Sequence, residues 1–226
     1  MPIGKVAIAA QLIPKENPRE FLPPGSEPHW YDWVAEHVLR SVSAGTPSQI
    51  SFVTFNYDRS LEYALVEAMR ASWGVGPEEA MKTLADVPIV HVHGALGHLG
   101  GWSATSRPFV ELVSHQTVEV ATAGIRIIHE VDIETAFGPA WTLLGEAEII
   151  CFLGCAYHRE NMERLNVAQI AGPGGKWVIG STCGMLPGEV YGAEHILQGR
   201  VTLRVGGGRD ALEFLRSEPV ALKMQG

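Results

Sequence analysis

Short apolar runs of β-branched and aromatic residues alternate along this chain with segments whose apolar residues recur every three or four positions. Runs of the first kind favour buried strands, and the second spacing is typical of amphipathic helices. Strands that alternate with helices build a parallel sheet covered on both sides. We therefore expect an α/β fold with a Rossmann-like, mostly parallel sheet and helices on both faces. The expected strands are residues 49–55, 87–92, 125–129, 148–153, 177–180 and 201–205.

Helical spacing fills much of the chain between these strands. The expected helices are residues 29–43, a segment that begins near Asp58 or Ser60 and runs to about Ser72, 134–145, 159–170 and 210–217. Residues 3–13 are almost wholly apolar, and this pattern fits a buried helix and a strand equally well. Proline-rich residues 14–28 favour an irregular loop, and the glycine- and serine-rich residues 94–106 favour a mobile one.

The size and charge of the chain exclude several classes of protein. With 226 residues it suits a single domain over 1–226, with a loop-rich or helical insertion around 94–124. Its net charge of -8 argues against a nucleic-acid partner, because such proteins carry a basic surface. No apolar run approaches the roughly 20 residues that span a bilayer, and the N-terminus makes a poor signal peptide. We expect a cytoplasmic protein without a membrane partner.

The three cysteines bear on metal binding. Cys151, Cys155 and Cys183 lack the paired C-x-x-C spacing of a zinc ribbon, so we expect reduced thiols and no zinc. His91 and His93 alternate along an expected strand and would share a face. They have no third ligand at metal-binding spacing, so we expect no metal there.

Polar residues and glycines follow four of the expected strands. The carboxyl ends of parallel strands lie at one edge of a sheet, where ligands of open α/β folds bind. We therefore expect these residues to converge on a nucleotide-binding crevice. They are Asn56, Tyr57 and Asp58 after the first strand, His93 and Gly94 after the second, Gly154 after the fourth, and Ser181 and Thr182 after the fifth.

Structural roles are an open alternative for the same residues. Asn56 and Asp58 can form an Asx turn that caps the next helix. Gly154 can be a turn glycine, and the run 206–208 is better interpreted as a turn than as a phosphate loop.

Three segments occur in an order that resembles a known family. They are F-V-T-F-N-Y-D-R-S-L-E at 52–62, H-V-H-G at 91–94 and F-L-G-C-A-Y-H-R-E-N at 152–161. This order resembles the sirtuin-like family, specifically its bacterial branch without a zinc ribbon, over residues 52 to about 182. The resemblance implies a Rossmann-like domain that uses NAD as its substrate. Members of this branch often act in antiphage defence as parts of larger proteins.

The resemblance also implies roles for single residues. Asn56 and Asp58 would line the pocket for nicotinamide and its ribose, and His93 would act on the ribose hydroxyls or position water. The further NAD contacts that it implies are Gly94, Gly154 and Asn161, with Ser181 and Thr182 as weaker matches.

The chemistry of NAD cleavage suits these residue types. Breaking the nicotinamide–ribose bond builds positive charge on the sugar, and a neutral imidazole can accept a proton at neutral pH. The resemblance therefore predicts an NAD glycohydrolase, which releases ADP-ribose and nicotinamide. The lack of a zinc ribbon favours this activity over protein deacylation, which stays an alternative.

Two departures from the family pattern support a second alternative. Position 55 is Phe, where this branch carries threonine, and the chain is expected to begin after the family's Gly-Ala-Gly phosphate loop. A catalytically degenerate protein that binds nucleotides or serves as a scaffold fits these departures. A sheet without its first strand would expose an edge, which a partner chain or a second copy would cover.

Overall fold

The computed structural model describes residues 2–23, 25, 27–43, 45–127, 132–172, 176–198, 202–204 and 210–218. The chain forms two compact units, Met1–Asp132 and Ile133–Gly226. The single domain over 1–226 stays a prediction.

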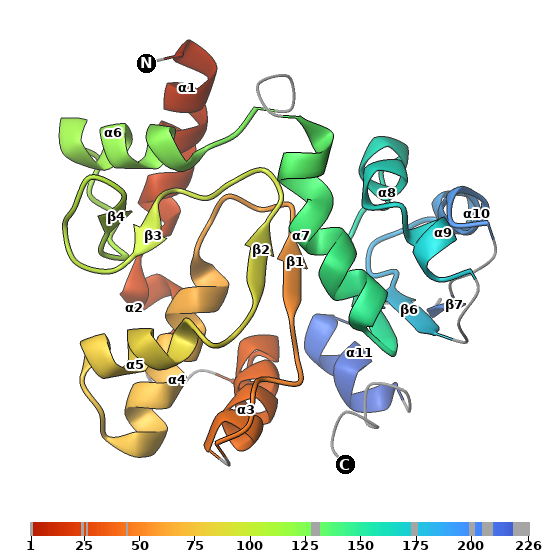
Figure 1. Ribbon diagram of the computed structural model, residues 1–226, viewed down its shortest axis with the longest axis horizontal. Coiled ribbons are helices and arrows are strands. Elements are labelled where there is room, and N and C mark those ends of the chain that lie inside the picture. Colours follow the sequence, from red (N-terminus) through yellow and green to blue (C-terminus); the bar gives the residue numbers. More distant parts are fainter. Residues whose placement is uncertain are drawn as a thin grey trace. The chain divides into compact units, whose positions relative to one another are not determined.

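The first unit is a mixture of helices and short strands (Figure 1). Its helices are α1 (Ile3–Leu12), the 3-10 helix η1 (Ile13–Lys15), α2 (Pro18–Phe21), α3 (Trp30–Ser43), α4 (Ser60–Trp73), α5 (Pro77–Leu84) and α6 (His115–Gly124). Its strands are β1 (Phe52–Thr54), β2 (Ile89–His91), β3 (His98–Leu99) and β4 (Ser106–Arg107). The predicted helix 29–43 is thus confirmed as α3, and residues 3–12 are a helix rather than a strand.

The strands β1 and β2 are joined through α4 and α5 and pair in parallel. Their register sets Phe52 opposite Ile89 and Thr54 opposite His91. Both strands are shorter than predicted, and their residues are half-buried, whereas the sequence pattern favoured buried strands. The parallel pairing brings both carboxyl ends to the same edge, as predicted.

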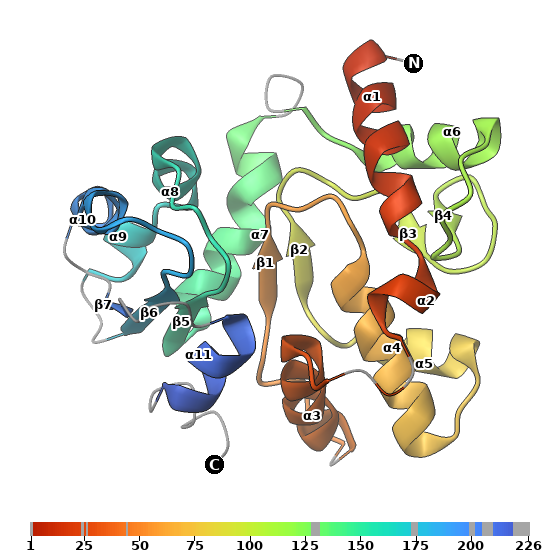
Figure 2. The ribbon, with the colours of Figure 1, turned by 180° about the vertical axis from the view of Figure 1, so that it is seen from behind.

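The helices α1 and α6 lie side by side, and the opposite views of Figures 1 and 2 both show this. Their packing buries a small apolar cluster of Ala9, Ile13, Leu96, Ala121 and Ile125. This cluster gives residues 94–106 more to bury than their composition indicates. Leu96 is buried, and the paired strands β3 and β4 occupy part of the segment that we expected to be a loop. The predicted strand 125–129 is reduced to a bridge between Ile125 and Gly94, and its last two residues lie outside the described residues.

The second unit contains two successive β–α–β connections. Its strands β5 (Ile149–Phe152), β6 (Trp177–Ser181) and β7 (Thr202–Arg204) form a parallel sheet in the order β5-β6-β7. Its helices are α7 (Ile133–Glu146), α8 (Arg159–Leu165), α9 (Val167–Ile170), α10 (Pro187–Ile196) and α11 (Ala211–Ser217). The expected strands at 148–153 and 177–180 are confirmed with shifted ends, and the described part of 201–205 is the strand β7.

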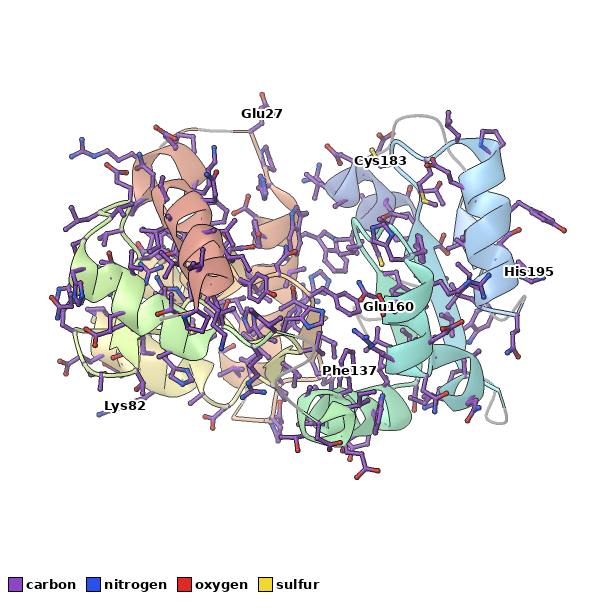
Figure 3. The ribbon with its side chains drawn as sticks, turned by 90° about the horizontal axis from the view of Figure 1, so that it is seen from above. Glu27, Lys82, Phe137, Glu160, Cys183 and His195 are labelled. Carbon is purple, nitrogen blue, oxygen red and sulfur yellow. The ribbon has the colours of Figure 1, made fainter. Side chains whose placement is uncertain are left out.

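One predicted helix of this unit is broken. We expected a continuous helix over 159–170, but Asn166 adopts a left-handed conformation with φ 56° and separates α8 from α9. Asparagine tolerates this conformation better than most residues. Figure 3 marks buried Phe137 on α7 and exposed Glu160 and His195 on α8 and α10.

The fold is therefore mixed α/β with short parallel strands. The named strands of the described segments pair in parallel, within small sheets. A single Rossmann-like sheet with helices on both faces stays a prediction. Among the described residues, no helix combines the length and the apolar character needed to span a membrane.

Candidate functional site

The loops that follow β1 and β2 are bonded to each other at the carboxyl edge of the pair. The Val92 N–H donates to the Thr54 carbonyl at 3.1 Å, and the Leu96 N–H donates to the Tyr57 carbonyl at 2.9 Å. Main-chain bonds of this kind hold the segment 54–58 against the segment 91–96. The first two sequence motifs therefore meet in space, as their places at the ends of parallel strands predicted.

Asn56 lies on the exposed side of this edge. Its N–H donates to the Thr54 hydroxyl at 3.0 Å, and its carbonyl oxygen accepts from His91 Nδ1 at 2.8 Å. Both ends of the residue's main chain are thus fixed. A side chain at such a position is presented to solvent from a rigid base, which suits contact with a ligand.

Asp58 is half-buried and turns the chain into α4. Its Oδ1 accepts from the Ser60 N–H at 3.1 Å, so the Asx turn that we considered as a structural role is present. The carboxylate also lies near Tyr31 of α3. Burial, and then the Asp58 carboxylate, raise the pKa of the Tyr31 hydroxyl above its ordinary value.

His93 is buried between two aromatic residues of the first motif. The centroid of its ring lies 5.7 Å from that of Phe55 and 6.3 Å from that of Tyr57. His93 as a whole residue is 9% exposed. The His93 carbonyl accepts from the Arg126 N–H at 2.8 Å. The imidazole is therefore buried near the rings of Phe55 and Tyr57, the two residues that flank Asn56.

Gly94 has a structural reason for lacking a side chain. Its φ is +74°, and a Cβ there would overlap the carbonyl oxygen of Gly124 at the end of α6. Only glycine fits this close approach of two main chains. Gly94 is itself buried, and its predicted contact with NAD stays a prediction.

A second histidine at this edge, His91, is bonded through both of its ring nitrogens. His91, the last residue of β2, bonds through Nδ1 to the Asn56 carbonyl and through Nε2 to Glu62 Oε1 of α4 at 2.7 Å. The side chains of His91 and Glu62 are 11% and 15% exposed. Sequence reasoning considered His91 only as a metal ligand, and the sole signal for this pair was that both residues lie within the resembling motifs.

Arg59, the arginine of the first motif, bonds the start of α4 to the segments around it. Arg59 is fully buried and donates to both carboxylate oxygens of Glu16 and to the carbonyls of His98, Arg107 and Pro108. Arg107 is also fully buried and donates to Glu16. These bonds tie the N-terminal segment and the β3–β4 region to the start of α4.

In the second unit the predicted residues Gly154 and Ser181 also meet. The Gly154 N–H donates to Ser181 Oγ at 3.0 Å, across the ends of β5 and β6. Tyr157, which belongs to the third resembling segment, donates from its hydroxyl to the Ser181 carbonyl at 3.0 Å. It holds a φ of 50°, which is uncommon for a residue with a side chain.

The other two predicted residues of this unit lie beside that pair in the sequence. Asn161 is half-buried in the first turn of α8, where its N–H donates to the His158 carbonyl at 3.0 Å. Thr182 is buried directly after β6. Gly154, Ser181 and Thr182 therefore form the carboxyl edge of the second unit's sheet, with Asn161 on the helix that follows.

Within the described ranges, no three side chains of His, Cys, Asp or Glu are grouped so that they could hold a metal ion. Comparisons with protein families, with curated proteins and with solved structures find no match to this chain. The function proposed below therefore depends on the geometry at the carboxyl ends of the strands.

Proposed function

We propose that this protein is a sirtuin-like NAD glycohydrolase that cleaves NAD at the carboxyl ends of β1 and β2. The observation that supports this most is the meeting of two motifs 35 residues apart, with His91 bonded to the Asn56 carbonyl. The same edge holds Asp58 and His93, so the residue types that NAD hydrolysis uses are close together. Ligands of α/β proteins commonly bind at this end of parallel strands.

The reaction can be assigned to these side chains step by step. The bond between ribose C1′ and the nicotinamide nitrogen breaks, and its electron pair leaves with neutral nicotinamide. Water forms the new bond to C1′, and the proton that it loses passes through His93 to solvent. NAD and water thus give ADP-ribose, nicotinamide and one proton. Asn56 holds the ribose through its amide, and the Asp58 carboxylate favours the positive charge that develops on the sugar.

In the second unit, Gly154, Asn161, Ser181 and Thr182 stay predicted nucleotide contacts, as the family resemblance implies. No zinc is needed for this chemistry, and the cytoplasm remains the proposed compartment.

The proposal is tested by measuring the nicotinamide that the purified protein releases from NAD. We expect His93→Ala and Asn56→Ala to lower turnover on the order of 10²-fold, the contribution typical of a positioned base. His195→Ala is the matched control, because His195 is exposed on α10 of the second unit. Absence of turnover in the intact protein, or full turnover in folded His93→Ala, contradicts the proposal. His93→Gln, which keeps more of the buried volume, separates loss of the base from loss of the fold.

A second candidate is a nucleotide-binding protein without turnover. The burial of His93 favours it, because a buried imidazole has little access to the water that it must activate. Calorimetry with ADP-ribose separates the two candidates: binding without release of nicotinamide supports the second.

A further inference from the structure

His91 occupies a position between the two elements that flank the first motif. It ends β2, while its partner Glu62 lies in the first turn of α4 and its other partner is the main chain of Asn56. Both side chains are largely buried, so water does not compete strongly for these bonds. The imidazole therefore links strand, loop and helix at the site of the proposed chemistry.

The hydrogen bonds fix how many protons the pair carries. A carbonyl oxygen and an ionised carboxylate can only accept, so both ring nitrogens of His91 must donate. His91 is then an imidazolium paired with the Glu62 carboxylate. If His91 lost a proton, one nitrogen would face an acceptor with a lone pair, and one of the two bonds would be lost.

The charges around the pair favour this protonated state. The groups that face it are Glu62 on α4, Asp58 on the loop and, beside these carboxylates, Tyr31 on α3. Burial lowers the pKa of His91, but the hydrogen bond and charge of Glu62, the Asn56 carbonyl and Asp58 outweigh burial, and the pKa is raised above its ordinary value. Among the described residues, the second oxygen of Glu62 is buried without a hydrogen-bond partner, so His91 is the principal contact of this carboxylate.

We infer that Glu62 and His91 are positioning residues: as an ion pair they hold the Asn56 main chain so that its amide meets the nicotinamide ribose, and the hold fails when the pair loses its proton. This inference rests on the proposed NAD chemistry for the identity of the ligand. It assigns a role to His91 that differs from the proposed base, His93.

The matched substitutions Glu62→Gln and Glu62→Ala test the inference in the full chain. Wild-type turnover is expected to fall as the pH rises through the raised pKa of His91. A glutamine amide can donate to neutral His91 while Nδ1 still donates to Asn56, so Glu62→Gln should keep its turnover at high pH. Glu62→Ala removes the anchor and should lower kcat on the order of 10²-fold with a smaller change in KM. Glu67→Gln, on the same helix and paired with Arg70, is the control.

A second measurement does not depend on activity. Nitrogen-15 NMR is expected to show that His91 titrates above about 6.5, the ordinary histidine value, and that the Asn56 side-chain amide shifts with it. Glu62→Gln should lower that titration point. If the wild type releases no nicotinamide but both resonances titrate together, the proposed function fails and the coupling stands. An Asn56 amide that ignores the titration of His91, or a Glu62→Gln pH profile like that of the wild type, overturns the inference.

Discussion

The Glu16 carboxylate is the counter-ion of two fully buried guanidinium groups, which makes it a sharp test of the first unit. It accepts from Arg59 Nε at 2.9 Å and from one further nitrogen of each arginine, and it is 1% exposed. Burial and the charge of Arg59 lower the pKa of Arg107, but a guanidinium in a protein stays protonated. Glu16→Gln therefore leaves two buried cations without a negative partner.

The expected loss follows from the cost of breaking a buried ion pair, about 3–5 kcal/mol. Glutamine keeps the shape and one acceptor, but its amide N–H groups point toward groups that only donate. A domain is stable by about 5–15 kcal/mol in total, so this is a large fraction. With a urea m value of about 2 kcal/mol/M, a loss of about 4 kcal/mol lowers the unfolding midpoint by about 2 M.

Hydrogen exchange read by mass spectrometry in a urea series is the suitable assay, because it reports each unit separately. Peptides over 52–65 and 94–108 should lose protection in Glu16→Gln, while peptides over 176–181 serve as the internal reference. Glu27→Gln is the control, since Glu27 is exposed in the same N-terminal region (Figure 3). A loss below about 1 kcal/mol, the range of an exposed ion pair, would refute the reasoning.

Three further predictions concern close contacts and pH. Gly94→Ala should destabilise the first unit by more than about 2 kcal/mol, because it combines a left-handed φ with overlap on the Gly124 carbonyl; an unchanged urea midpoint would contradict this. In Gly180→Ala the new Cβ would overlap the Tyr157 hydroxyl, so adding Tyr157→Phe should recover part of the lost stability; a double variant no more stable than the single one would argue against it. The stability that protonated His91 contributes is present below about pH 6.5 and is lost as pH rises through its raised pKa. Urea midpoints should therefore fall between about pH 6 and about pH 9 in the wild type and less in His91→Gln.

Local patterns predicted most of the elements that they could encode. The apolar run 148–153 predicted β5, and the apolar spacing of 29–43 predicted α3. Both patterns depend only on residues that are close in the sequence. The helix or strand ambiguity of 3–13 is settled only by packing on α6, more than 100 residues away. The break at Asn166 lies in a segment whose spacing is helical throughout, so its left-handed conformation left no trace in periodicity.

The pairs that build the site were beyond sequence reasoning for the same reason. Glu16 and Arg59 are 43 residues apart, and His91 and Glu62 are 29 apart. Neither pair has a spacing that a helix or a hairpin would impose. Placement at strand ends predicted that Asn56 and His93 would be neighbours, but not that His91 would bond to Asn56.

In the first motif, Asp58 and Arg59 hold the local structure together, whereas Asn56 is exposed to solvent. Arg59 is buried among carbonyls and a carboxylate, and Asp58 caps the turn into α4, so changing either one perturbs the fold before any chemistry is measured. Asn56 is exposed while its main chain is held at both ends. Changing the Asn56 side chain therefore tests function more directly than changing a buried residue of the motif. A loss of NAD turnover without a loss of stability is the result that would assign Asn56 a role in the reaction.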